Sequence, residues 1–296
     1  MKERRALITG INGFTGRYLA PELQAAGYRV FGTGHHGESG GTDIYTVDLC
    51  DRDGLGAVVA EVRPDVVAHL AAISFVAHGD AETMYRVNLV GTRRLLEALA
   101  ALGAPPHAVL LASSANIYGN APVELIDESV VPAPANDYAV SKLAMEYLAR
   151  LWMDRLPIVI TRPFNYTGVG QPLHFLLPKI VAHYRARAPV IELGNTDVAR
   201  DFSDVRTVAV AYRRLLEAAP AGEVFNVCSG NAYTLTDVLR MMGDIAGYEI
   251  QVTINPAFVR ANEVKRLVGS NRKLLRAIGP LPWIPIEETL QWMYGA

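Results

Sequence analysis

The sequence predicts an α/β fold in which a doubly wound parallel sheet is followed by a smaller C-terminal α/β lobe. The first half of the 296 residues alternates short apolar runs with longer helical patterns, which is typical of repeated β-α-β units. These runs are apolar throughout instead of alternating with polar residues, so the strands should be covered by helices on both faces. The second half is less regular, which indicates a separate lobe.

The elements of the sheet can be placed in order along the chain. Helical patterns separate most of the predicted strands, and right-handed crossovers then give a doubly wound arrangement. Pro21 falls inside the first helix and should kink it or mark a weak turn. The predicted strands are Ala6–Thr9, Tyr28–Gly32, Ile44–Val47, Val66–Leu70, Ala108–Ala112 and Ile158–Thr161. The predicted helices are Thr15–Ala26, Leu55–Val62, Ala81–Leu102 and Tyr138–Arg155.

The second lobe is expected to begin near residue 166. Further strands are predicted at Pro189–Leu193, Val224–Cys228 and Glu249–Ile254, and the strand at Val224–Cys228 should return to the sheet. The lobes should pack closely, with a cleft between them. The predicted division gives residues 1–165 to the sheet domain, with a return at about 202–230, and residues 166–201 and 231–296 to the second lobe.

The composition excludes several classes of protein. The formal net charge is −2, and no basic run would attract nucleic acid or an anionic membrane. Cys50 and Cys228 are too few for a disulfide scaffold and lack metal-ligand spacing, so no metal is expected. No apolar run is long enough for a membrane span or a signal segment. We therefore expect a cytoplasmic protein without nucleic-acid or membrane partners.

A glycine-rich turn follows the first predicted strand, in the segment Thr9-Gly10-Ile11-Asn12-Gly13-Phe14-Thr15-Gly16. Glycines at this spacing let the backbone turn tightly and approach a pyrophosphate, which binds at the N-terminus of the following helix. Its place between a strand and a helix predicts a Rossmann-type dinucleotide-binding domain. Cofactor contacts are expected from Gly10, Asn12, Gly13, Phe14, Thr15 and Gly16.

The end of the second predicted strand indicates which dinucleotide binds. The carboxylate that would bind an adenosine ribose is missing there, and the strand runs into Gly32-Thr33-Gly34-His35-His36. Without that carboxylate a 2′-phosphate is not repelled, and His35, His36 or Arg17 offers donors to it. We therefore expect NADP(H) to be favoured, with NAD(H) as the second option.

Other positions near the strand ends are also expected to contact the cofactor. Asp48 either accepts from the adenine amino group or caps the next helix. His69 is expected to be a packed, hydrogen-bonded histidine. The remaining cofactor contacts are expected from Asp48, Leu49, Leu70, Ala71, Ala72 and Pro163.

The segment Tyr138-Ala139-Val140-Ser141-Lys142 places a phenol and an ammonium on one face of a helix. A Tyr ordinarily titrates near 10, so acid–base work near neutral pH needs a neighbour that stabilises the phenolate, such as this cation. Ser114 follows the fifth predicted strand, and the carboxyl ends of parallel strands share one edge. The glycine-rich turn, Ser114 and the Tyr138–Lys142 pair should therefore converge at one site.

These motifs, together with the segment from Arg162 to Gln171 (RPFNYTGVGQ), resemble the extended short-chain dehydrogenase/reductases that act on nucleotide sugars. The resemblance covers nearly the whole chain. It implies that Ser114, Tyr138 and Lys142 form a catalytic triad. In that triad Tyr138 is the acid/base, Lys142 holds the nicotinamide ribose and lowers the Tyr138 pKa, and Ser114 hydrogen-bonds the reacting oxygen. Asn88 resembles a supporting Asn on the helix under the site.

One departure and one further resemblance indicate which member of this family the chain is similar to. Dehydratases of the family carry carboxyl groups in the turn after the Ser or Thr, whereas this chain has Ala115 and Asn116, which cannot transfer a proton in that way. The segments Arg200–Val205 and Arg260–Val264 resemble GDP-mannose 4,6-dehydratases and their partner reductases. The resemblance implies that Arg200 and Arg260 clamp a diphosphate. Substrate contacts are expected from Ser114, Asn116, Asn165, Arg200, Arg260 and Glu263.

The combination predicts an NAD(P)H-dependent reductase of the C4 ketone of a GDP-linked 4-keto-6-deoxy sugar, a hexose or a heptose. The product would be GDP-D-rhamnose, its C4 epimer GDP-6-deoxy-talose, or a heptose equivalent. A nucleotide-sugar 4-epimerase that retains NAD is the alternative within the family, and a non-catalytic NAD(P)-binding protein is a remote one. The family resemblance also implies a homodimer or a homotetramer.

Overall fold

A seven-stranded parallel sheet forms the centre of the larger lobe, in the order β11-β6-β5-β4-β1-β2-β3. This confirms the doubly wound α/β fold. The computed structural model describes residues 3–34, 43–74, 80–259 and 264–296. The strand order reverses at β1, where a doubly wound sheet opens a ligand crevice. The strands are β1 (Arg4–Thr9), β2 (Tyr28–Gly34), β3 (Ile44–Thr46), β4 (Val66–His69), β5 (Ala108–Ala112), β6 (Ile158–Pro163) and β11 (Val224–Val227).

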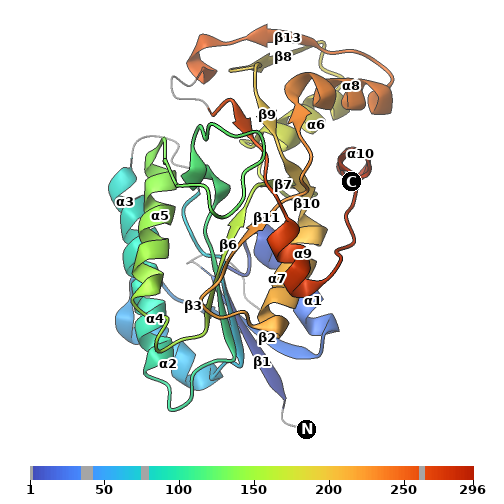
Figure 1. The fold of residues 1–296 in the computed structure, drawn as a ribbon. Helices are drawn as coiled ribbons and strands as arrows, with labels where there is room; N and C mark the ends of the chain where they lie inside the picture. Colours follow the sequence, from blue (N-terminus) through green and yellow to red (C-terminus); the bar gives the residue numbers. More distant parts are fainter. Residues whose placement is uncertain (1–2, 35–42, 75–79, 260–263) are drawn as a thin grey trace.

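Two layers of helices cover the sheet because successive strand residues point to opposite faces. Leu7 belongs to the core formed with the helices of one face, and the next residue, Ile8, belongs to the core on the other face. Figure 1 shows the two layers on opposite sides of the strands. The Leu7 face is covered by α2 (Arg52–Val62), α4 (Thr92–Ala100) and α5 (Asp137–Arg150). The Ile8 face is covered by α1 (Phe14–Ala25), α7 (Val205–Ala218) and α9 (Arg272–Ile278). Helix α1 continues through Pro21.

The long helix predicted over Ala81–Leu102 is built from three consecutive pieces. α3 (Ala81–Tyr85) leads into a π-helical stretch (Arg86–Gly91), which leads into α4. A π turn accommodates one extra residue and is frequently found at functional sites. Asn88 lies in this stretch and is 2% exposed.

The helix predicted over Tyr138–Arg155 is too long at its C-terminal end, because α5 ends at Arg150. The following backbone closes into tight turns, in which the Trp152 N–H donates to the Ala149 carbonyl at 2.9 Å. These turns direct the chain into β6 while Trp152 and Met153 pack against the Leu7-side core. Tertiary packing therefore ends the helix where local propensity would continue it.

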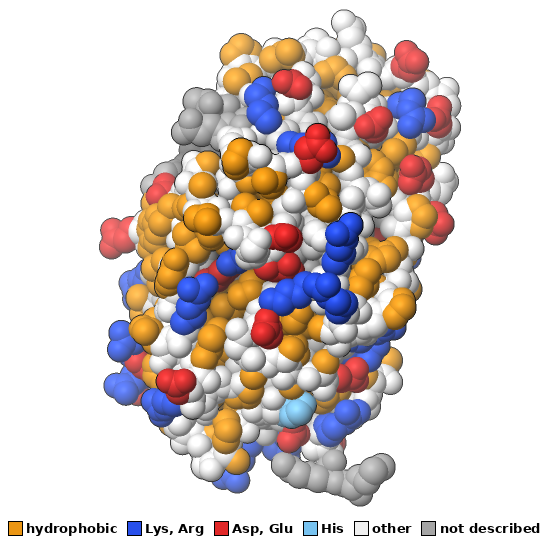
Figure 2. All heavy atoms as spheres, in the orientation of Figure 1, with side chains coloured by type: hydrophobic (Ala, Val, Ile, Leu, Met, Phe, Trp, Pro, Cys, Tyr) orange, Lys and Arg blue, Asp and Glu red, His pale blue; other side chains and the backbone are white. Residues whose placement is uncertain are grey.

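The second lobe lies beyond the carboxyl ends of the strands, at the top of Figure 1. It contains short paired strands, and its own core unites α6, α8 and α10. On the face seen in Figure 2, Lys and Arg side chains are interspersed with Asp and Glu. The helices are α6 (Leu176–Arg185), α8 (Leu235–Ala246) and α10 (Ile286–Gly295). The strands pair as β10 (Phe202–Asp204) with β7 (Asn165–Thr167), β13 (Gln251–Ile254) with β8 (Val190–Leu193), and β9 (Ala199–Arg200) between β12 (Tyr233–Thr234) and β14 (Arg266–Leu267).

Candidate active site

The glycine-rich turn forms a cradle that side chains would fill. Gly10 has φ +72°, and a Cβ atom there would lie 2.9 Å from the Ala71 Cα. A Cβ on Gly16 would lie 2.4 Å from the Ile11 carbonyl oxygen. Gly13 precedes α1 and has no side chain to cap it, so the first N–H groups of the helix can bind an anion. The turn fits a dinucleotide pyrophosphate.

A cavity of about 370 Å³ opens beside this turn at the carboxyl edge of the sheet. We call it the cofactor-side cavity. It brings together residues from the glycine-rich turn, the ends of β4, β5 and β6, and α5. The predicted site residues that line it are Gly10, Gly13, Phe14, Thr15, Gly16, Leu70, Ala72, Ser114, Asn116, Tyr138, Lys142, Pro163 and Asn165.

Tyr138 and Ser114 are hydrogen-bonded to each other in this cavity. Burial raises the pKa of the Tyr138 phenol above its ordinary value, the nearby Tyr166 adds to the rise, and the Ser114 hydrogen bond opposes it. Burial therefore outweighs any lowering of this pKa in the protein alone, and the predicted effect of Lys142 on it stays a prediction. The Lys142 Nζ atom donates to the Ala112 carbonyl at 2.8 Å and lies 5.9 Å from the Tyr138 ring centroid. Tyr138 is thus protonated at neutral pH and can act as a proton donor.

Lys142 is buried, with 6% of its surface exposed. Burial lowers the pKa of the Lys142 ammonium to about 8, while the negative charge of Glu146 raises it. Glu146 lies one turn further along α5, on the same side of the helix. The ammonium is therefore charged at neutral pH, but it titrates closer to neutrality than an exposed lysine.

His69 is a packed histidine at the end of β4, as the sequence predicts. Its Nδ1 atom lies 2.7 Å from the Thr9 hydroxyl, and its Nε2 atom lies 2.8 Å from the Thr92 hydroxyl. The Thr92 hydroxyl donates to the Asn88 carbonyl, so the network assigns the ring proton to Nε2 and leaves Nδ1 to accept from Thr9. Burial lowers the pKa of His69 to about 3, and the Lys142 charge lowers it further. The ring is neutral and connects the sheet to the π-helical stretch.

Asn88 joins two segments that flank the cavity. Its Oδ1 atom accepts from the Ile73 N–H at 2.9 Å, and its Nδ2 atom donates to the Ile73 carbonyl at 3.1 Å and to the Ser141 hydroxyl at 3.0 Å. Ser141 precedes Lys142 in α5. Asn88 therefore fixes the backbone that follows β4 against the helix that carries Tyr138 and Lys142.

A second cavity, of about 330 Å³, adjoins the first and extends into the smaller lobe. We call it the substrate-side cavity, and it contains Arg200. The Arg200 Nη1 atom donates to the Ala199 carbonyl at 3.0 Å, while Asp201 and Asp204 accept from other groups. The two cavities share a wall made of Ser74, Asn116, Asn165, Tyr166, Gln171, His174 and Phe175.

Among the described residues, four of the predicted cofactor contacts (Asn12, Asp48, Leu49 and Ala71) lie outside the lining of the cofactor-side cavity. Asp48 accepts from the Cys50 N–H at 2.8 Å, and Asp51, not Asp48, caps α2 by accepting from the Gly54 N–H. Leu49 is buried in the Leu7-side core, because Gly91 packs directly on it. The Asn12 carbonyl accepts from Arg17, and the Ala71 N–H donates to the Thr9 hydroxyl. His35, His36, Arg260 and Glu263 lie outside the described residues.

Comparison with known proteins places this arrangement in a family. The family model described as GDP-mannose 4,6 dehydratase matches residues 7–293. The chain belongs to the GDP-mannose 4,6-dehydratase family.

Several relatives of this family member carry a named activity. It is 36% identical over 302 residues to a GDP-6-deoxy-D-mannose reductase of Pseudomonas aeruginosa, covering 97% of this chain and 95% of the relative. It is 33% identical over 278 residues to a GDP-6-deoxy-D-talose 4-dehydrogenase of Aggregatibacter actinomycetemcomitans, covering 93% and 91%.

Two solved structures resemble this member of the GDP-mannose 4,6-dehydratase family over nearly their whole length. One is a Burkholderia cenocepacia J2315 protein described as a candidate epimerase, with 60% identity, a TM-score of 0.93 and coverage of 99% of this chain and 97% of that one. The other is RMD from Pseudomonas aeruginosa complexed with NADPH, with 35% identity, a TM-score of 0.86 and coverage of 99% and 97%.

Sequence reasoning missed Tyr166, although it lies in the RPFNYTGVGQ segment of this family member. Its hydroxyl lies 2.7 Å from the Thr15 hydroxyl, and its ring stacks on Phe14 with centroids 6.0 Å apart. Gln171 holds the same segment, because its amide donates to the Tyr166 carbonyl at 3.0 Å. An aromatic residue in a Pro- and Gly-rich segment gives no periodic signal, so only the fold reveals that Tyr166 stands between the two cavities.

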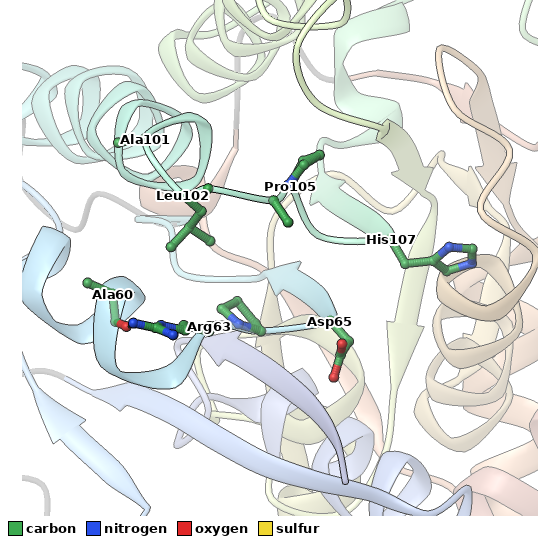
Figure 3. Close-up of a pocket in the computed structure, with 10 residues that line it drawn as sticks. Ala60, Arg63, Asp65, Ala101, Leu102, Pro105 and His107 are labelled. Carbon is green, nitrogen blue, oxygen red and sulfur yellow. The ribbon is translucent and has the colours of Figure 1, made fainter. Parts of the chain in front are cut away.

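A larger cavity, of about 760 Å³, lies at the opposite edge of the sheet. Figure 3 shows Asp65 and His107 beside it, at the starts of β4 and β5, with Arg63 and Leu102 on the neighbouring loops. None of the predicted site residues lines it.

Of the helices that the structure describes, none combines the length and apolarity needed to cross a membrane.

Proposed function

We propose that the protein reduces the C4 ketone of a GDP-linked 4-keto-6-deoxy sugar with NADP(H), or less favourably NAD(H). The observation that carries this proposal is the shared wall between the two cavities. It joins the cradle, Ser114, Tyr138 and Lys142 on one side to Arg200 on the other. A nucleotide sugar whose diphosphate lies near Arg200 can therefore extend its sugar toward the Tyr138 hydroxyl.

The cradle supports a nicotinamide dinucleotide as the cofactor. Gly10 and Gly16 leave space that a Cβ atom would fill, and a solved relative holds NADPH. Phe14 and Thr15 line the cavity at the start of α1. The bound cofactor supplies a hydride to the carbonyl carbon.

The chain's own residues handle the oxygen of the ketone. Tyr138 donates its proton to the oxygen as negative charge develops there, and Ser114 hydrogen-bonds the same oxygen. The buried positive charge of Lys142 then stabilises the phenolate that Tyr138 leaves behind. Arg200 binds the diphosphate, since a guanidinium offers several donors in a fixed geometry.

The family name includes dehydratases, but the residues after Ser114 do not suit dehydration. Elimination requires removal of one proton and protonation of a leaving hydroxyl, which calls for carboxyl groups. Ala115 and Asn116 occupy those positions, and Ala115 is 1% exposed. The relatives named as a reductase and as a 4-dehydrogenase support chemistry at C4 instead.

The test is to incubate the protein with GDP-4-keto-6-deoxy-mannose and NADPH. We expect stoichiometric oxidation of NADPH, with a product that NMR identifies as GDP-6-deoxy-mannose or GDP-6-deoxy-talose. The two products differ only in the face that receives the hydride. Absence of cofactor oxidation with GDP-, UDP- and dTDP-linked 4-keto sugars would refute the proposal.

A nucleotide-sugar 4-epimerase is the second candidate, because the 60% identical structure is described as a candidate epimerase. An epimerase returns the hydride to its substrate and consumes no external reductant. Interconversion of two GDP- or UDP-sugars without net oxidation of added NADPH would favour this alternative.

The titration of Lys142 predicts how activity depends on pH. Burial lowers the pKa of its ammonium to about 8, so the charge is present below that pH and is lost as pH rises through it. We expect kcat/KM to decline above about pH 8, because that parameter reports groups of the free enzyme. Measurement between about pH 6 and about pH 10 checks this. Lys142→Arg keeps its charge and should lack the alkaline decline, whereas a flat wild-type profile would contradict the assignment.

A further inference from the structure

Asp201 is a fully buried carboxylate that the catalytic scheme does not use. It lies between β9 and β10, and 0% of its surface is exposed. A buried carboxylate is costly unless donors surround it. Here one oxygen accepts from the Ser229 N–H and from the Ser229 hydroxyl, each at 2.8 Å. The other accepts from the Gly230 N–H at 2.8 Å and from the Gly269 N–H at 3.4 Å.

These donors come from segments far apart in the sequence. Ser229 and Gly230 follow β11, an edge strand of the large sheet, and Gly269 follows β14 of the second lobe. Gly269 is itself tightly enclosed, since a Cβ atom there would lie 2.5 Å from the Phe164 ring. Phe164 lines the cofactor-side cavity. The Asp201 carboxylate thus joins the end of the large sheet, the second lobe and a wall of the site.

The strand held in this way carries Arg200. β9 is two residues long and lies between strands that are also two residues long, so its ladder supplies few backbone hydrogen bonds. Two of them are Ala199 N–H to the Lys265 carbonyl at 2.8 Å and Asp201 N–H to the Leu267 carbonyl at 2.9 Å. The register of so short a strand therefore depends strongly on the Asp201 side chain.

We propose that Asp201 is a positioning residue for the nucleotide sugar, because its carboxylate fixes the strand that presents Arg200 to the substrate-side cavity. This rests on the proposed function, in which Arg200 binds the diphosphate. Asp201 does not touch the substrate. It acts by holding Arg200 where the two cavities can accommodate one extended ligand.

The charge of Asp201 is consistent with this role. Burial raises the pKa of Asp201 to about 6, while the hydrogen bonds from Ser229, Gly230 and Gly269 lower it. The carboxylate is therefore ionised at about pH 7.5 and presents acceptors alone. An asparagine amide in its place would turn an NH₂ group toward the N–H donors, and two donor groups cannot hydrogen-bond to each other.

The experiment compares GDP and NADPH binding to Asp201→Asn and to the wild-type protein, by isothermal titration calorimetry at about pH 7.5. We expect the Kd for GDP to rise about tenfold, because binding must then restore the position of Arg200, and the loss of one charged hydrogen bond that fixes it corresponds to about that factor. The Kd for NADPH should change less than about twofold, since the cradle is untouched. Equal weakening of both ligands, or an unchanged Kd for GDP, would overturn the proposal. Asp244→Asn is the matched control, because Asp244 lies in the same lobe with 73% of its side chain exposed.

A second variant decides the matter if Asp201→Asn does not fold. Ser229→Ala removes the hydroxyl donor, which also accepts from the exposed Asn231 N–H, and leaves all three N–H donors to the carboxylate. It should therefore raise the Kd for GDP about threefold with the Kd for NADPH unchanged. No change in the Kd for GDP would then reject the role of Asp201. Failure of the proposed function is distinguishable, because in that case the wild-type protein binds NADPH but not GDP.

Discussion

Tyr138→Phe is expected to lower kcat about 10²- to 10⁴-fold, because it removes the proton donor to the developing alkoxide. The ring stays in place, so the α5 helix and the cofactor-side cavity should be unaffected. Burial keeps the phenol protonated at neutral pH by raising its pKa, which suits a donor in ketone reduction. Single-turnover oxidation of NADPH measures the effect on the chemical step, and a Kd titration shows that cofactor binding is retained.

Tyr147→Phe is the matched control for that substitution. Tyr147 lies on the same helix, with 57% of its surface exposed. Removing its hydroxyl should leave kcat unchanged. If Tyr138→Phe retained more than about a tenth of the wild-type kcat, another group would have to supply the proton, and the role of Tyr138 would be rejected.

Glu146→Gln is expected to lower the free energy of unfolding by about 3–5 kcal/mol, because it leaves the Arg162 guanidinium buried without its counter-ion. The two side chains are 4% and 1% exposed and form a bidentate pair, at 2.7 Å from Nη2 to Oε2 and 3.0 Å from Nε to Oε1. Arg162 also donates to the Tyr118 hydroxyl at 2.8 Å. Urea denaturation at neutral pH measures the loss.

A surface pair of the same geometry provides the control for Glu146. Arg29 and Asp43 are also bidentate, but their side chains are 46% and 32% exposed. Asp43→Asn should leave the free energy of unfolding nearly unchanged, because solvent screens the pair. Equal losses for the two substitutions would show that burial does not set the strength of the Arg162–Glu146 pair.

Since Glu146 raises the Lys142 pKa, Glu146→Gln should also move the alkaline decline in kcat/KM to lower pH.

The sheet and the glycine-rich turn could be predicted because their signals are local. Continuous apolar runs mark the strands, and the Gly10 and Gly16 positions tolerate no side chain. The apolar residues Leu95, Leu96 and Leu99 of α4 are fully buried, whereas Leu151, just beyond the end of α5 but inside the predicted helix, is 78% exposed. Periodicity alone did not separate these two cases, because it gives the face of a helix and not what covers that face. The homodimer or homotetramer stays a prediction.

The supports of the site could not be read from the sequence. Nothing in the sequence around Asp201 marks it as buried, and only the fold brings Ser229, Gly230 and Gly269 around it. The π-helical stretch around Asn88 likewise has no composition signal, since one extra residue in a turn leaves the apolar pattern nearly intact. Both depend on contacts between residues that are distant in the chain.

The shared wall between the two cavities has a thermodynamic consequence. Tyr166 and Phe175 border both cavities, so either ligand restricts side chains that the other must also meet. Ordering that the first ligand has already imposed costs the second ligand nothing more. The resulting coupling is reciprocal: whatever factor the dinucleotide applies to the affinity for the nucleotide sugar, the nucleotide sugar applies to the affinity for the dinucleotide. The two ligands therefore strengthen each other's binding equally. A preferred order of binding would then reflect the rates at which the ligands enter the joined cavities.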